Sequence, residues 1–287
     1  MSSDFSEISC PFEDKFAPFH EFEKSLCNEI ALCSDVDKKE QLTWKLATFY
    51  LETARPDKAI AHLRWILETT RNEESKKDSL HTLQYLIGSE EITPSISEES
   101  LNLPDVLWQL ASAFLRKRHQ QPGVLCLLRL IDISSDREQR AECFFLLGAE
   151  SEKSDDHDAA AQFYQGGIEC GPKEIRTRYF LHNNFGYCLN KLGRHDEAES
   201  ACREAIEIDP RRYNAYKNLG IALQGQGEFS EAAALFLEAA FLHPLDPRSL
   251  GHLEEILADH REEVEREIPD IAMQIAGAIE ARNKMIQ

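Results

Sequence analysis

Apolar residues recur at intervals of three and four along most of this chain, which predicts a protein built from amphipathic helices. Within residues 179–246, a longer period of 34 residues is superimposed on that pattern. Its five columns pair Gly186 with Gly220, Gly193 with Gly227, Ala198 with Ala232, Ala205 with Ala239, and Pro210 with Pro244. A period of this length indicates a repeated pair of helices that stacks on its neighbours.

Each column has a physical role in such a helix pair. The first glycine has no Cβ atom, so the second helix can approach closely, and the first alanine is small enough to fill the gap. The second glycine follows the last apolar residue of the first helix, where a left-handed C-cap is expected. The proline ends the second helix.

The same pattern continues less regularly on both sides. From Gly148 to Gly186 the interval is four residues longer than the period, about one helical turn, so we expect a helix to start early, near Glu174. After Pro244 we expect a half-repeat over 247–259 and a final helix over 269–284, with Pro269 at its first position.

The chain therefore divides into five predicted segments. They are a flexible lead-in (1–15), N-terminal helices with a degenerate repeat (16–87), an irregular linker (88–103), the main array (104–260, clearest over 141–174, 179–212 and 213–246), and a capping helix (261–287).

The glycine, alanine and proline columns resemble those of the tetratricopeptide repeat family. The resemblance implies an all-α, right-handed superhelical solenoid of antiparallel helix pairs, with capping helices at both ends. It also implies that the first helix of each pair lines a concave face, whose outward-facing residues bind an extended peptide.

An asparagine amide suits that task, because its two donors and one acceptor can pair with a peptide backbone. The expected peptide-binding residues are Asn183, Asn184, Tyr187, Lys217, Asn218, Arg248 and His252. The carboxylate clamp of heat-shock co-chaperones, a narrower resemblance, is matched by Asn218 and Arg248. The chain departs from that clamp at Asn183, Tyr187 and His252, which favours at most a weaker anion-seeking groove with Lys217 and Arg248.

Composition narrows the possible partners. Lysine and arginine total 32 against 51 aspartates and glutamates, a formal net charge of −19, which disfavours nucleic-acid binding. The compact basic run at 116–119 lies at a predicted helix C-terminus, where the helix dipole favours cations. The eight cysteines form no C-x-x-C pair, so no metal site or cofactor is expected, and Cys143, Cys188 and Cys202 are expected in the core.

The remaining sequence signals concern location and chemistry. No signal peptide or apolar run of membrane-spanning length is visible, which predicts a cytoplasmic protein that does not bind membranes. No phosphate loop, nucleophile elbow or H-E-x-x-H motif is present, which predicts that the chain is not an enzyme.

We therefore expect a non-catalytic scaffold that binds a peptide or partner segment in its concave groove. One alternative is a chaperone for a secreted or assembling partner protein. Another is a structural subunit of a larger complex that uses its convex face and end helices. Self-association through the terminal helices, the 269–284 helix above all, also remains open.

Overall fold

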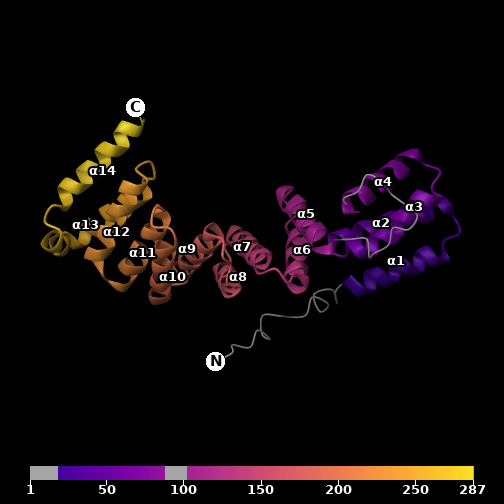
Figure 1. Ribbon diagram of the computed structural model, residues 1–287, viewed down its shortest axis with the longest axis horizontal. Helices are drawn as coiled ribbons and strands as arrows, with labels where there is room; N and C mark the ends of the chain where they lie inside the picture. Colours follow the sequence, from indigo (N-terminus) through magenta and orange to yellow (C-terminus); the bar gives the residue numbers. More distant parts are fainter. Residues whose placement is uncertain (1–18, 88–101, 287) are drawn as a thin grey trace, which may run out of the picture. The chain divides into compact units, whose positions relative to one another are not determined.

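The computed structural model describes residues 19–87 and 102–286, and all regular structure in those residues is α-helical (Figure 1). The predicted all-α fold is therefore confirmed. The chain divides into two compact units, Met1–Ser135 and Asp136–Gln287. The predicted lead-in at 1–15 and most of the linker at 88–103 lie outside the described residues.

The described part of the first unit consists of helices that pack on their sequence neighbours from α1 to α4, followed by the helical hairpin α5–α6. In chain order they are α1 (His20–Leu32), α2 (Val36–Glu52), α3 (Pro56–Thr69), α4 (Glu73–Ile87), α5 (Leu103–Arg116) and α6 (Gln120–Ile133). Pro56 begins α3, where its missing N–H removes no helical hydrogen bond.

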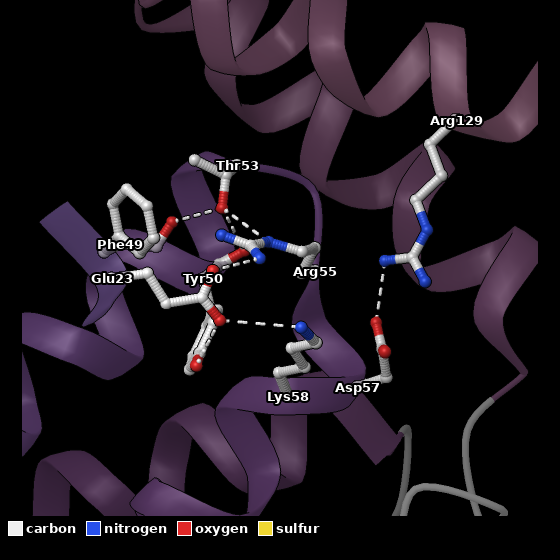
Figure 2. Close-up of polar contacts among 8 residues, drawn as sticks. All are labelled: Glu23, Phe49, Tyr50, Thr53, Arg55, Asp57, Lys58 and Arg129. Carbon is white, nitrogen blue, oxygen red and sulfur yellow. Dashed lines mark hydrogen bonds and ion pairs between the residues drawn. The ribbon is translucent and has the colours of Figure 1, made fainter. Parts of the chain in front are cut away.

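The α5–α6 hairpin belongs to this first unit, whereas the sequence pattern placed 104–260 in one array. The reason is visible at Arg129 of α6 (Figure 2). Its guanidinium donates to the Asp57 carboxylate at 2.7 Å and to the carbonyl of Ala54, both at the α2–α3 turn. These contacts between residues more than 70 positions apart are invisible to a periodicity argument.

The second unit consists of stacked helical hairpins in which the first helices of neighbouring pairs, α7, α9 and α11, also contact one another. The helices are α7 (Arg137–Lys153), α8 (His157–Glu169), α9 (Ile175–Lys191), α10 (His195–Ile208), α11 (Tyr213–Gln226), α12 (Phe229–Leu242), α13 (Arg248–Glu267) and α14 (Ile271–Ile286). The early start predicted near Glu174 is confirmed, because Glu174 caps α9 by accepting from the Thr177 N–H.

One type of turn joins the two helices in five of the hairpins. At Gly193, for example, the N–H bonds to the Asn190 carbonyl at 3.1 Å, and the next N–H, of Arg194, bonds to the Leu189 carbonyl at 2.9 Å. This is a Schellman motif, which needs one residue in the left-handed region. That residue is Ala54, Arg118, Asp155, Gly193 or Gly227, with φ of 57°, 62°, 59°, 73° and 90° respectively. The left-handed caps predicted at both glycines are thus confirmed.

The close approach predicted at the first glycine column is also observed. A Cβ atom added to Gly186 would lie 2.5 Å from the Cys202 Sγ, and one added to Gly220 would lie 2.8 Å from the Phe236 ring. In both cases the residue that faces the glycine differs from the predicted alanine: Cys202 lies one turn beyond Ala198, and Phe236 lies one turn beyond Ala232. The predicted burial of Cys143, Cys188 and Cys202 is confirmed.

The last two helices differ in detail from the prediction. α13 continues to Glu267, but its backbone leaves helical geometry at His260 (φ −123°), next to the predicted end of the half-repeat. α14 begins at Ile271, so Pro269 is not at its first position. The Ile271 N–H instead bonds to the Ile268 carbonyl at 3.1 Å and closes a turn around the proline.

Within the described ranges, no helix combines the length and the apolar character required to cross a membrane.

Candidate functional site

The seven residues predicted to bind a peptide lie on the first helices of the second unit. They are Asn183, Asn184 and Tyr187 on α9, Lys217 and Asn218 on α11, and Arg248 and His252 on α13. We call the side of these three helices that carries them the polar face.

Asn183 and Asn218 join α9 to α11. Asn218 Nδ2 donates to Asn183 Oδ1 at 3.2 Å and to the Asn183 carbonyl at 3.3 Å. The Asn218 carbonyl in turn accepts from Asn190 Nδ2 at 2.7 Å. Both side chains are buried, with 6% of Asn183 and 3% of Asn218 exposed. Their amides therefore hold neighbouring repeats together, a task that the sequence analysis did not assign to them.

The hydrogen bonds continue from α9 toward α7. Asn183 Nδ2 donates to Asn184 Oδ1 at 2.9 Å, and Asn184 Nδ2 donates to the Tyr164 hydroxyl at 3.2 Å. That hydroxyl donates to the Glu152 carboxylate. We name the series Glu152, Tyr164, Asn184, Asn183 and Asn218 the asparagine ladder. Because every donor in it has a defined acceptor, the amide orientations are fixed before any ligand arrives.

One polar atom of the asparagine ladder accepts no hydrogen bond from the described residues. Asn218 Oδ1 is buried and has no hydrogen-bond partner among the described residues. A buried acceptor without a donor is uncommon and costs folding free energy. The α11 end of the asparagine ladder therefore has one hydrogen-bond acceptor without a donor.

Positive charge lies beside the asparagine ladder at Lys217. Only 8% of this lysine is exposed, and no carboxylate in the described part of the chain forms an ion pair with it. Burial lowers the pKa of Lys217, the nearby Arg248 charge lowers it further, and Asp246 opposes the shift. Burial and the neighbouring Arg248 charge therefore both disfavour the protonated form of this side chain.

Arg248 is more exposed and already paired. Its Nη2 lies 2.6 Å from Asp246 Oδ2, and its Nε donates to the same carboxylate. These hydrogen bonds hold the pKa of Asp246 well below its usual range, although burial alone would raise it. The Arg248 guanidinium therefore affects the polar face mainly through its positive charge, because Asp246 already accepts its hydrogen bonds.

The Tyr187 ring meets the His157 ring edge to face, with centroids 5.8 Å apart, and Lys191 Nζ lies over it at 5.7 Å. Burial raises the pKa of the half-buried Tyr187, nearby acids add to the rise, and the Arg248 charge opposes it. His252 is turned elsewhere: its ring stacks on Phe236 of α12 with centroids 5.0 Å apart, and its Nδ1 lies 3.3 Å from Glu255. Hydrogen bonds therefore join Asn183, Asn184 and Asn218, whereas Tyr187 and His252 pack on other residues.

A second polar cluster, in the first unit, was not predicted (Figure 2). Arg55 Nη1 lies 2.7 Å from Glu23 Oε2, and the Tyr50 hydroxyl donates to Glu23 Oε1 at 2.9 Å. Burial alone would raise the pKa of Glu23, but these hydrogen bonds outweigh it and lower the pKa. The Arg55 guanidinium also lies over the Phe49 and Tyr50 rings, at 5.3 and 4.9 Å from their centroids.

This second cluster has a structural role. Glu23 belongs to α1 and Arg55 precedes α3, so the ion pair fastens α1 to the α2–α3 turn. The sequence offered no signal for it, because α1 and Arg55 share no period.

Among the described residues, no group of three or more histidine, cysteine, aspartate or glutamate side chains is arranged to hold a metal ion.

Comparison with known proteins matches residues 178–240, from α9 to α12, to the family described as "Tetratricopeptide repeat". Human "Tetratricopeptide repeat protein 7A" is 24% identical over 145 residues, which cover 50% of this chain and 16% of that protein. "Small glutamine-rich tetratricopeptide repeat-containing protein 2" of Mycosarcoma maydis is 28% identical over 113 residues, 39% of this chain and 30% of that protein. The chain thus spans less than a third of each relative.

Among solved structures, "MamA RS-1 ArsTM double mutant" superposes with a TM-score of 0.50 at 14% identity. The superposition covers 63% of this chain and 97% of that one. At this identity the likeness shows a shared fold alone.

Proposed function

We propose that this chain, which is a tetratricopeptide repeat protein, binds an extended segment of a partner protein along the polar face of α9, α11 and α13. The fold is that of a protein-interaction scaffold, since stacked helical repeats present extended binding surfaces. The proposed role is non-catalytic, with binding as the whole of the function.

The observation that carries the proposal is the unpaired Lys217. A buried ammonium without a carboxylate costs folding free energy, and a peptide carboxylate or carbonyl in the groove would supply the missing acceptor. Arg248 adds attraction for the same anionic group. Tyr187, on the facing helix, offers an amphipathic ring of the kind that anchors peptides at interfaces.

The asparagine ladder supports the same role in a different way. Its internal hydrogen bonds use the amides of Asn183 and Asn218, so these two residues shape the polar face more than they touch a ligand. Asn184 is half-buried, and its amide is also used within the ladder. Because a rigid site loses little entropy on binding, the ladder pre-organises the face for an extended segment.

The test starts from random dodecapeptides displayed on phage and selected on the wild-type protein. Affinities of the selected peptides are then measured by fluorescence anisotropy for wild type, Lys217→Met and Tyr187→Ala. Lys217→Met keeps the length and apolar stem of the side chain, so a loss of binding reports the charge. The matched control is Lys173→Met, which removes the same charge from an exposed position of the same unit.

Binding that weakens about tenfold in Lys217→Met and Tyr187→Ala, but not in Lys173→Met, supports the polar face as the site. Failure to enrich any peptide, or equal affinities in all four proteins, would overturn the proposal. Equal affinities would also direct attention to the convex face and the end helices.

A further inference from the structure

Negative charge is sparse in the α5–α6 hairpin, where Asp105 and Asp132 lie near its two ends. Between Asp105 and Asp132 the sequence contains no aspartate or glutamate, although the whole chain contains 51 of them and carries a net charge of −19. The same stretch contains Arg116, Lys117 and Arg118 in succession, followed by His119. An acidic protein thus has one compact basic site, at the turn between two helices of the first unit.

These four side chains are exposed, and no ion pair holds Arg116, Lys117 or Arg118 in the described part of the chain. Some exposed arginines elsewhere are paired: Arg194 lies 2.6 Å from Glu197 and Arg261 lies 3.0 Å from Glu265. The helix dipole accounts for a cation in the last turn of α5, which is Arg116 alone. The next three residues lie beyond that helix and need another explanation.

Arg118 also occupies a backbone position that favours glycine. Its φ of 62° is in the left-handed region, and it takes the place that Gly193 and Gly227 take in the equivalent turns. A long side chain there strains the backbone, and strained residues concentrate at functional sites. Ala54 and Asp155 hold the same backbone position in their turns, so the charged side chain, rather than the backbone, distinguishes the turn at Arg118.

Aromatic side chains border the charges. Tyr85, near the end of α4, is 41% exposed. Burial raises its pKa, and the Arg116 charge opposes the rise. The His119 ring stacks on Phe114 with centroids 6.4 Å apart. An aromatic stack of His119 on Phe114 thus lies beside the charged side chains of the turn.

We infer that Arg116, Lys117, Arg118 and His119, here called the basic turn, form a docking surface for a short acidic segment of a partner protein. Carboxylates in such a segment would pair with the Arg116, Lys117 and Arg118 cations, which form no ion pair among the described residues. A long polyanion or an anionic membrane would also meet the surrounding acidic surface, which repels it. A short peptide meets the basic turn alone. This surface lies on a different unit from the polar face, and the inference does not depend on the function proposed for that face.

The probe is fluorescein-labelled octaglutamate, measured by anisotropy against the full chain at low and at physiological salt. The test variant is Arg116→Gln/Lys117→Gln/Arg118→Gly, which places glycine where the equivalent turns already have it. The matched control is Arg71→Gln/Lys76→Gln/Lys77→Gln. It removes the same three charges from exposed positions of the same unit, where Glu73, Glu74 and Asp78 lie alongside. Circular dichroism checks the fold of both.

We expect octaglutamate to bind wild type in a salt-sensitive manner and about tenfold more weakly to the test variant, since three exposed charge contacts are lost. The control should bind like wild type. Equal affinity for all three proteins would overturn the inference, as would loss of binding in Lys217→Met, which would assign the probe to the polar face.

Three further arms exclude other occupants. Tighter binding of a dT20 oligonucleotide, or of vesicles with 30% phosphatidylserine, than of octaglutamate would overturn the inference in favour of a nucleic acid or a membrane. Salt-sensitive dimers of wild type that the test variant lacks, detected by light scattering, would instead identify the occupant as a second copy of this chain.

Discussion

Asn218 donates a hydrogen bond to Asn183 at 3.2 Å, across 35 positions of the sequence and between the first helices of two successive repeats. In a solenoid each repeat is stabilised mainly by its neighbours, so a polar contact between repeats strengthens the coupling between them. The same amides were expected to face a peptide. Their burial means that substitutions there change stability as well as binding.

Asn218→Ala should therefore destabilise the second unit. The substitution leaves the Asn183 Oδ1 buried without its donor from α11, a loss of about 1–3 kcal/mol. Urea unfolding followed by circular dichroism measures the change. Asn283→Ala, at an exposed position of α14, is the control and should change the free energy of unfolding by less than about 0.5 kcal/mol. Equal stability of the two variants would show that the contact between repeats does not contribute to the free energy of unfolding.

The glycine columns give a second prediction. Gly220→Ala would place a Cβ atom 2.8 Å from the Phe236 ring, which is fully buried and has no room to move. We expect a loss of about 1–3 kcal/mol from overpacking. Gly251→Ala is the matched control, because a Cβ atom there meets nothing within 4 Å. That change should stabilise α13 by up to about 1 kcal/mol through helix propensity. Opposite signs for the two substitutions, measured by thermal unfolding, are the expected result.

A third prediction concerns pH and the Glu152 end of the asparagine ladder. Burial raises the pKa of Glu152, although the Tyr164 hydroxyl and the nearby His157 oppose the rise. The folded protein therefore holds this proton more tightly than the unfolded chain. The resulting stability is fully present below the ordinary glutamate pKa of about 4.3 and is lost as pH rises through the higher folded-state value.

Glu152→Gln should remove that loss, because the amide oxygen still accepts from Tyr164 and carries no charge. We expect the variant to gain stability over wild type as pH rises from 4 to 7, measured as free energy of unfolding in urea at each pH. Glu207→Gln, an exposed glutamate of α10, is the control and should follow wild type. A parallel pH profile for wild type and Glu152→Gln would contradict the assignment.

The sequence predicts the parts of this fold that repeat. Gly193 and Gly227 predict their left-handed turns, because glycine is the residue that such turns favour. The long interval before Gly186 predicts the early start of α9. The same reasoning does not detect Arg118 or Ala54, which adopt the same turn without glycine. Periodicity detects a conformation only where the residue that favours it is present.

The polar contacts could not be predicted, for a related reason. Asn183 stands three residues before Gly186, and Asn218 stands two residues before Gly220 of the same column, so their pairing depends on how one repeat is rotated against the next. The Glu23–Arg55 ion pair depends on where α1 lies, which no repeat specifies. Sequence spacing places side chains on helices, but their partners follow from packing between helices.

The last prediction separates charge from backbone strain at the basic turn. Arg118 has a φ of 62°, where a side chain with a Cβ atom costs about 1–2 kcal/mol relative to glycine. Arg118→Gly removes both the strain and the charge, whereas Arg118→Ala removes the charge and keeps the strain. We expect Arg118→Gly to raise the free energy of unfolding of the first unit by about 1 kcal/mol, and Arg118→Ala to leave it near the wild-type value. Urea unfolding of the full chain, followed at Trp65 and Trp108 in a Trp44→Phe background, reports on this unit because all three tryptophans belong to it. A gain of similar size in both variants would identify charge repulsion among Arg116, Lys117 and Arg118, rather than the backbone, as the source of the cost.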